Sequence, residues 1–76
     1  MNQPFSIGQR VRPFGDGEDS NGNIIKWTKV RGEVVDIWMD GEGQFSEWRV
    51  EVKWDDRVMD KQYGTRMPAY LLSPIQ

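Results

Sequence analysis

Residues 47–56, EWRVEVKWDD, decide the fold class of this chain. From Trp48 to Trp54, large apolar side chains alternate with charged ones. A period of two places each set on its own face of a strand, whereas a helix would spread both sets around its circumference. The stretch therefore predicts a half-buried antiparallel strand, with Trp48 and Trp54 in the core and charges of alternating sign on the exposed face.

The size and composition of the chain restrict its chemistry. It has 76 residues, the size of one domain with a small core. Cysteine and histidine are both missing, so disulfides, thiolate chemistry and imidazole catalysis are excluded. Four Trp, two Tyr and three Phe can reinforce a small core and favour self-association. We expect one domain over residues 1–76, with residues 1–5 disordered.

The charge pattern argues against two classes of partner. Ten basic and twelve acidic side chains are mixed along the sequence, giving a net charge of −2, and this provides no basic field for duplex nucleic acid. No apolar run approaches the roughly 20 residues that span a bilayer, and residues 1–9 lack the features of a signal peptide. We expect a cytoplasmic protein that does not bind membranes.

The N-terminal third predicts a short strand and a long loop. Residues 9–12 alternate in polarity and form the expected first strand, which ends at Pro13 because proline cannot extend a ladder. Residues 14–23 are rich in glycine, asparagine and acidic side chains, as is typical of a long mobile loop. Its acidic cluster lacks the spacing of a calcium loop, so no metal site is expected there. The cluster comprises Asp16, Glu18 and Asp19.

The middle of the chain predicts a second strand at residues 30–39, joined to the third by a hairpin at residues 40–46. The second strand is rich in β-branched and aromatic residues. Its Val34–Val35 doublet breaks the alternation, which indicates a β-bulge where the strand bends. The connection contains Asp-Gly, a typical hairpin sequence.

Two adjacent carboxylates, Asp55 and Asp56, directly follow Trp54. Neighbouring residues of a strand point to opposite faces and cannot share a proton, so these two are expected to form a turn. A fourth strand is then predicted at residues 58–67, with a kink at Gly64.

The C-terminal residues predict a helical turn and a last strand. Residues 68–71 are too few for an α-helix and fit a single 3₁₀ turn. Residues 73–76 are the predicted last strand, with Ile75 pointing inward.

This layout is all-β: about five strands, a long acidic loop after the first and a 3₁₀ turn before the last. It resembles a small SH3-like barrel, of the group that includes the plasmid-borne type II dihydrofolate reductases, a small accessory protein of photosystem I and the variable subunit of ferredoxin–thioredoxin reductase. The segments that carry the resemblance are GQRVR (8–12), GEVV (32–35), VEVK (50–53) and YLLSPI (70–75). They are short and mostly structural, so they specify a fold better than an activity.

The active-site motif of the type II reductases is not retained in this chain. Their active site uses a V-Q-I-Y-P run that lines the pore of a homotetramer. At the matching point this chain has GTRMP (64–68), which keeps only the proline, and the pore lysine has no counterpart in residues 39–42. We therefore carry over no catalytic residue from the resemblance.

The aromatic residues define the expected contact surface. A small barrel does not comfortably enclose four tryptophans, so we expect some of them in an exposed apolar patch, which marks an interface. Arg66 adds a cation that can pair with a carboxylate or phosphate, although an outward Arg on an edge strand also limits aggregation. The expected surface consists of Trp27, Trp38, Phe45, Tyr63, Arg66, Met67 and Tyr70.

The leading hypothesis is a non-enzymatic module without cofactor that contacts a protein partner or assembles with itself. One alternative is a diverged relative of the type II reductases that uses NADPH in a tetramer pore. Another is a single-stranded nucleic-acid reader, which requires several arginines to converge on one face. These are Arg10, Arg12, Arg49 and Arg66.

Overall fold

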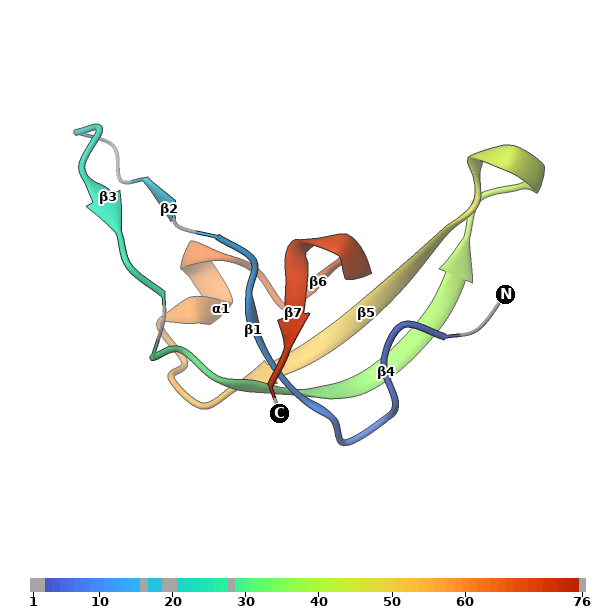
Figure 1. The fold of residues 1–76 in the computed structure, drawn as a ribbon, viewed down its shortest axis with the longest axis horizontal. Helices are drawn as coiled ribbons and strands as arrows, with labels where there is room; N and C mark the ends of the chain where they lie inside the picture. The colour runs from blue at the N-terminus through green and yellow to red at the C-terminus, as the bar shows by residue number, and fades with distance from the viewer. Residues whose placement is uncertain (1–2, 16, 19–20, 28, 76) are drawn as a thin grey trace.

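The centre of the molecule is a long antiparallel hairpin formed by β4 (Gly32–Asp40) and β5 (Glu47–Trp54) (Figure 1). We describe it from a computed structural model, which covers residues 3–15, 17–18, 21–27 and 29–75. In β5, Val50, Val52 and Trp54 are buried, while Lys53 between them is exposed. The predicted strand and its buried apolar face are confirmed from Val50 to Trp54, whereas Trp48, which was expected in the core, is only partly buried.

The predicted bulge is present in β4. The register with β5 shifts between Val34, which pairs with Val52, and Asp36, which pairs with Glu51. Val34 is fully buried, whereas Val35 is exposed. The extra residue lets β4 turn from the core towards the hairpin tip without losing its partner strand.

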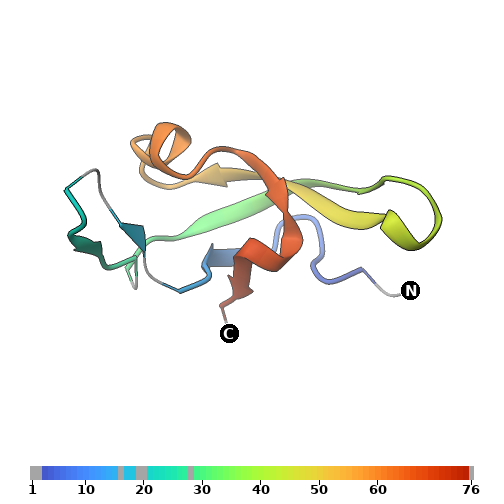
Figure 2. The ribbon, with the colours of Figure 1, turned by 90° about the horizontal axis from the view of Figure 1, so that it is seen from above.

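Three short strands complete the main sheet, in the order β6-β5-β4-β1-β7. They are β1 (Arg10–Pro13), β6 (Arg66–Pro68) and β7 (Leu72–Pro74). Figure 2 shows β1 and β7 lying on one side of the β4–β5 hairpin, so the sheet bends around the core. Among the described residues the sheet remains open, because β6 and β7 form its two edges. The strand β1 begins and ends one residue later than predicted, with Pro13 paired to Leu72.

Part of the predicted acidic loop is a small second sheet. Gly17–Glu18 forms β2 and pairs with Ile24–Ile25, which forms β3. The indole of Trp27 lies over Gly17 so closely that a Cβ there would come within 2.3 Å of the ring. Asp16 and Asp19 of the predicted acidic cluster lie outside the described residues.

The predicted fourth strand over residues 58–67 is wrong. The chain forms a one-turn helix, α1 (Met59–Gln62), before the short strand β6. Asp56 accepts a hydrogen bond from the Val58 N–H, and Arg57 pairs with Asp60 across the turn. These local contacts favour a helical turn, and burial of Met59 fixes it against the core.

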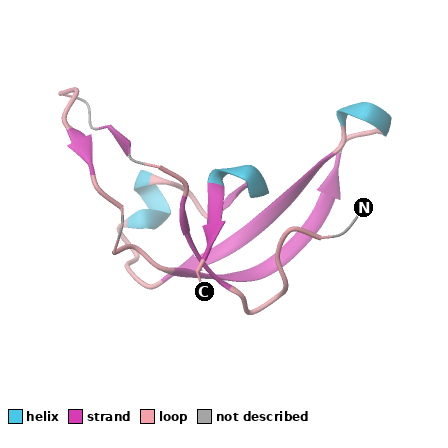
Figure 3. Ribbon diagram, viewed as in Figure 1, coloured by secondary structure: helices cyan, strands magenta, loops and turns pink. Residues whose placement is uncertain are grey.

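Two further helical segments in the described chain are 3₁₀ turns, drawn with α1 in cyan in Figure 3. The first, η1 (Gly43–Phe45), closes the predicted hairpin between β4 and β5. The second, η2 (Ala69–Leu71), confirms the predicted turn before the last strand. That strand, β7, begins one residue earlier than predicted, and Leu72 provides its buried side chain while Ile75 is partly buried.

The core is a single apolar cluster enclosed by the bent sheet, α1 and η2. Its members are Phe5, Val11, Val34, Val50, Val52, Trp54, Met59, Met67, Ala69 and Leu72. The expectation that residues 1–5 are disordered fails at Phe5, whose side chain is only 6% exposed. The described chain is therefore a small all-β domain, as the sequence predicts.

Candidate functional site

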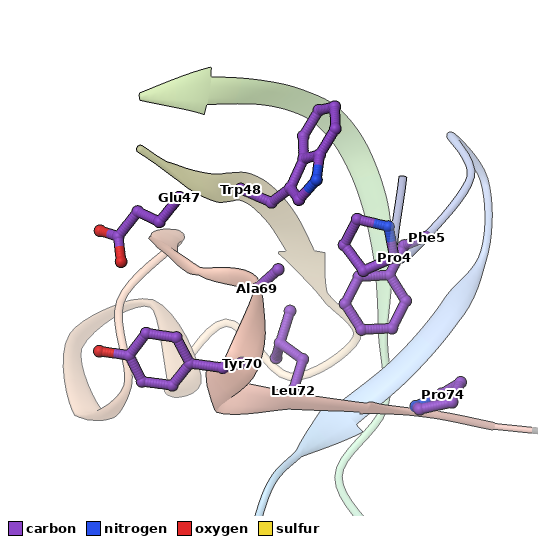
Figure 4. Close-up of a pocket in the computed structure, with 8 residues that line it drawn as sticks. All are labelled: Pro4, Phe5, Glu47, Trp48, Ala69, Tyr70, Leu72 and Pro74. Carbon is purple, nitrogen blue, oxygen red and sulfur yellow. The ribbon is translucent and has the colours of Figure 1, made fainter. Parts of the chain in front are cut away.

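An apolar groove of about 440 Å³ opens on the surface beside η2. Segments from the two ends and the middle of the chain form its walls, as the close-up in Figure 4 shows. The described residues that line it are Pro4, Phe5, Glu47, Trp48, Ala69, Tyr70, Leu72 and Pro74. Aromatic and proline rings thus make up most of the lining, which is typical of a binding site.

The local structure of η2 explains how its side chains shape the groove. Ala69 points into the core and Tyr70, the next residue, is 69% exposed. A 3₁₀ turn has three residues per turn, so consecutive side chains diverge widely. The turn therefore anchors itself through Ala69 and presents the Tyr70 ring to solvent at the edge of the groove.

Trp48 forms the wall opposite η2 and carries an unpaired donor. Its Nε1 is buried and has no hydrogen-bond partner among the described residues. In Figure 4 this nitrogen lies on the edge of the indole that faces the other labelled residues. A buried donor without an acceptor costs about 1–3 kcal/mol. The groove wall therefore contains a buried N–H group whose loss of water no acceptor among the described residues offsets.

The charge at the groove comes from Glu47, whose side chain is partly exposed. Its Oε1 accepts a hydrogen bond from Arg49 Nη1 at 3.0 Å. The same guanidinium lies 3.8 Å from the carboxylate of Asp40, which is paired with Glu47 in the sheet register. One arginine thus faces two carboxylates, and this end of the groove has an excess of negative charge.

Phe45 and Trp38, two residues of the predicted contact surface, lie on the same hairpin arm as the groove. Phe45 is in η1 at the tip of the arm and is 80% exposed. Trp38 is partly buried in β4, opposite Arg49. Phe45 and Tyr70 are thus exposed aromatic rings, whereas Trp38 shares the face of Arg49, which is opposite to the face that carries Trp48.

Trp27 and Tyr63 lie elsewhere and pack against the core. Their rings meet edge to face, with centroids 4.8 Å apart, and Tyr63 makes a similar contact with Trp54 at 5.7 Å. The Tyr63 hydroxyl donates to the Leu71 carbonyl, and burial raises the pKa of this phenol. These two residues mainly shield the core at the C-terminal end of β5, next to Trp54.

Met67 does not belong to the surface that the sequence predicts. Its side chain is 3% exposed and belongs to the core, because β6 turns alternate side chains inward and outward. The outward neighbour, Arg66, donates from Nε to Glu51 Oε1 at 2.7 Å. An outward arginine on this edge strand agrees with a role in limiting edge-to-edge association.

The adjacent carboxylates Asp55 and Asp56 form a turn, as predicted. Asp56 accepts the Val58 N–H at 3.0 Å, while Asp55 forms an ion pair with Arg10. The hydrogen bond from Arg10 lowers the pKa of Asp55 below its ordinary value. The two side chains therefore have separate partners and do not form an acid–base pair.

The groove contains residues that sequence reasoning missed. Pro4 and Phe5 were expected to be disordered, and Trp48 was assigned wholly to the core. The available signal was the pair of apolar residues at positions 4 and 5, directly before the first strand. Such a pair can pack back on the sheet when the sheet leaves an open end.

Comparisons with protein-family models, with curated proteins and with solved structures find no match for this chain. Within the described residues, no group of three or more acidic side chains is placed to hold a metal ion. The same part of the chain contains no helix that is long and apolar enough to cross a bilayer.

Proposed function

We propose that this chain is an SH3-like small barrel that acts as a protein-interaction module. The barrel assignment is supported by the strand order and by η2, which joins the two edge strands β6 and β7. A strongly bent five-stranded sheet whose edges are joined by one 3₁₀ turn nearly encloses its core. The bulge in β4 supplies the bend that such a barrel needs.

The observation that carries the interaction function is the apolar groove beside Tyr70. Small domains bury large aromatic rings where they can, so an accessible ring beside an apolar hollow indicates a contact site. Phe45 at the tip of the neighbouring arm extends this surface. The contact is made with a partner protein or with a second copy of the chain.

Oligomeric mass in solution, combined with fluorescence quenching, tests this function. Sedimentation equilibrium should show association, either of the chain with itself or with a partner captured on it. An aqueous quencher should reduce tryptophan emission in the free chain, because Trp38 and Trp48 are partly exposed. A strict monomer without partners, and with all tryptophans protected from the quencher, would contradict the proposal.

The two alternatives from the sequence remain predictions without a supporting observation in the described structure. The run that would line a reductase pore contains Met67, which is in the core, and Arg66, which is paired with Glu51. For nucleic-acid binding, Arg10 and Arg49 are likewise paired with carboxylates. Paired arginines neutralise phosphates less effectively than free ones.

A further inference from the structure

We propose that the outer edge of β4 over residues 36–40, which we call the arm edge, binds an extended basic segment of a partner protein as an added antiparallel strand. The arm edge is separate from the groove, so this inference goes beyond the proposed function and does not depend on it. It rests on the direction of the backbone groups, on the two carboxylates that flank them and on the apolar side chains between.

The arm edge has no neighbouring strand in the described part of the chain. The register of β1 with β4 covers only Gly32 and Glu33. The N–H and C=O of Val34 still bond to the residues just before β1. Beyond this point β4 leaves β1 and runs out with β5 as a two-stranded arm (Figure 1). One side of β4 is therefore open to an incoming strand.

The backbone groups of Ile37 and Met39 point towards this open side. Successive residues of a strand direct their N–H and C=O groups to opposite edges, and two residues that face each other either exchange both bonds or neither. The Val52 N–H bonds on the side of β6, so every second residue of β5 back towards the turn also directs its groups away from β4. Ile37 and Met39 pair with two of these residues, and their own groups therefore face away from β5.

Asp36 satisfies one of these donors in the free chain. Its Oδ1 accepts the Ile37 N–H at 2.9 Å. An incoming strand would offer a carbonyl to this N–H, and a basic side chain of the same strand would pair with the carboxylate that it displaces. Both groups remain bonded after the exchange, so the local hydrogen bond protects the edge without preventing binding.

The charges of the arm edge exclude a second copy of the chain as the added strand. A symmetric antiparallel pair that uses the whole arm edge is centred on Trp38. It places Asp36 of each copy directly opposite Asp40 of the other, and like charges in that position are destabilising. A pair centred on Ile37 extends into the bulge between Val34 and Asp36, where the ladder is irregular.

The same two carboxylates define the chemistry of the partner. Asp36 and Asp40 lie four residues apart on one face of β4, opposite Glu51 and Glu47 of β5. Lysine or arginine at both ends of a five-residue segment would lie directly opposite the two aspartates. Charge complementarity therefore selects a segment that is basic at its first and fifth residues.

The residues between the carboxylates add an apolar requirement. Ile37 and Met39 lie on the other face of β4, where Ile37 packs against the core and Met39 is 39% exposed. β-Branched side chains at the second and fourth residues of the segment would cover this surface. The ligand is thus an extended segment that alternates basic and apolar residues, recognised by strand addition.

Backbone methylation of a peptide tests strand addition directly. We would titrate the isotope-labelled full chain with the capped peptide Lys-Val-Thr-Val-Lys and record proton–nitrogen correlation spectra. The Met39 amide signal should move downfield as its N–H gains a carbonyl. N-methylation of both valines removes the donors that face β4 and should weaken binding about tenfold or more. N-methylation of the threonine, whose N–H faces away, should change the affinity less than about twofold.

A charge-reversed peptide tests the second feature of the ligand. Replacing both lysines by glutamates should weaken binding about tenfold at low salt and less at high salt. Equal affinity of the lysine and glutamate peptides would overturn the inference. Equal affinity of the peptides methylated at valine and at threonine would do the same, because the ligand would then not be a strand of the sheet.

Variants of the chain locate the site. Asp36→Asn removes the charge while its amide oxygen can still accept the Ile37 N–H, and should weaken peptide binding about threefold at low salt. The effect of Asp40→Asn should be smaller, because Arg49 already lies 3.8 Å from that carboxylate. Glu42→Gln is the matched control, since Glu42 lies in the turn beyond the arm edge. Its affinity should equal that of the wild type.

A reversed charge should also make the arm edge self-complementary. Asp36→Lys converts both like-charge contacts of the pair centred on Trp38 into opposite-charge contacts. Sedimentation equilibrium should then show a dimer that the wild type does not form, whereas Glu42→Lys, with the same change in net charge, should sediment as the wild type does. If Asp36→Lys associates no more than Glu42→Lys, the arm edge does not accept a strand and the inference is wrong.

A variant of the groove separates this inference from the proposed function. Tyr70→Ala removes the exposed ring beside the groove and should leave binding of the basic peptide unchanged. A peptide that loses affinity in Tyr70→Ala and keeps it in Asp36→Asn lies in the groove, which overturns this inference and leaves the proposed function standing. A peptide that moves neither the Ile37 nor the Met39 signal also overturns the inference, whatever the groove binds.

Discussion

The two ends of β5 carry the same residue on the same face, yet they differ in almost every physical respect. Trp54 at one end is 1% exposed, donates to the Gly64 carbonyl and contacts Tyr63 edge to face. Trp48 at the other end is partly exposed, and its N–H has no partner among the described residues. The alternation in the sequence is identical at both positions, so the difference arises from what surrounds the strand.

The number of neighbouring elements explains the contrast. Near Trp54, the hairpin is flanked by β1, which pairs with β4 at Gly32 and Glu33, and by the loop that leads into β6. Towards Trp48, the described pairing of β5 with β6 ends at Arg49. Beyond this point the hairpin is a two-stranded arm, which is marginally stable by itself. One end of β5 therefore stabilises the fold, and the other is available for binding.

The largest effect is expected from a charge placed in the strand between these ends. Val52→Asp puts a carboxylate where the native side chain is 1% exposed and no cation is adjacent in the described core. Burying an unpaired charge should cost more than about 4 kcal/mol and leave the chain unfolded. Circular dichroism and the dispersion of amide signals measure this directly.

The control for that variant is its neighbour on the opposite face. Glu51→Ala removes the surface ion pair with Arg66, and such pairs contribute little in water. Its thermal midpoint should change by less than about 3 °C. A folded Val52→Asp chain, or an unfolded Glu51→Ala chain, would show that the faces of β5 are assigned the wrong way round.

The next largest effect is expected at Gly32, which packs closely against the side chains of Val52 and Trp54. Gly32 pairs with Trp54, and a Cβ at Gly32 would come within 2.6 Å of Val52 and 2.7 Å of the Trp54 ring. Gly32→Ala should destabilise the chain by about 3 kcal/mol through overpacking. Denaturant unfolding measures the change.

Gly43→Ala provides the comparison at the tip of the arm. No described atom lies within 4 Å of a Cβ built there, so the remaining penalty is that of a positive φ of 56°. This should cost about 1 kcal/mol. If Gly32→Ala and Gly43→Ala lower the free energy of unfolding by the same amount, close packing does not distinguish the two ends of the hairpin.

A conservative change at the two tryptophans compares them most directly. Trp54→Phe should cost about 2 kcal/mol, because it leaves a cavity and removes the bond to the Gly64 carbonyl. Trp48→Phe should lie within about 0.5 kcal/mol of the wild type, since it also removes a buried donor that has no partner among the described residues. Equal losses in urea unfolding would mean that Trp48 is a core residue like Trp54.

The sequence predicts the hairpin well for a physical reason. The alternation around Val52 and the Val34–Val35 doublet depend on neighbours within a few residues, and both features appear in the structure as predicted. The turn η2 follows in the same way from the short run after Pro68. Local pattern is sufficient where each residue's environment is set by its own strand or turn.

The helix α1 and the groove depend on information that is not local. The predicted strand over residues 58–67 fails because the local turn at Asp56, which accepts the Val58 N–H, and the burial of Met59 override a weak alternation. The groove joins Phe5, Trp48 and Tyr70, which are far apart in the sequence. No periodicity within one segment can show that these residues meet, and the open end of the sheet that admits Phe5 is itself a tertiary feature.

The smallest expected effect is the dependence of stability on pH at the Trp54 end of β5. Asp55, next to Trp54, pairs with Arg10, and this hydrogen bond lowers its pKa in the folded state. A lowered pKa means that the unfolded chain binds more protons in acid, so the stabilisation is present above the unfolded pKa of about 4 and is lost as the pH falls through the folded value. Both groups are exposed, so the contribution is small and decreases with salt.

Asp55→Asn should therefore flatten the acid side of the stability curve. Urea midpoints measured from pH 6 down to pH 2 should fall slightly less steeply in this variant than in the wild type, with the difference confined to the region below about pH 4. Asp56→Asn is the matched control, because it removes a neighbouring carboxylate while its amide oxygen can still accept the Val58 N–H. A pH profile of Asp55→Asn that matches the wild type would mean that the Arg10 pair does not hold the Trp54 end of β5 to β1, and that packing alone separates the two ends.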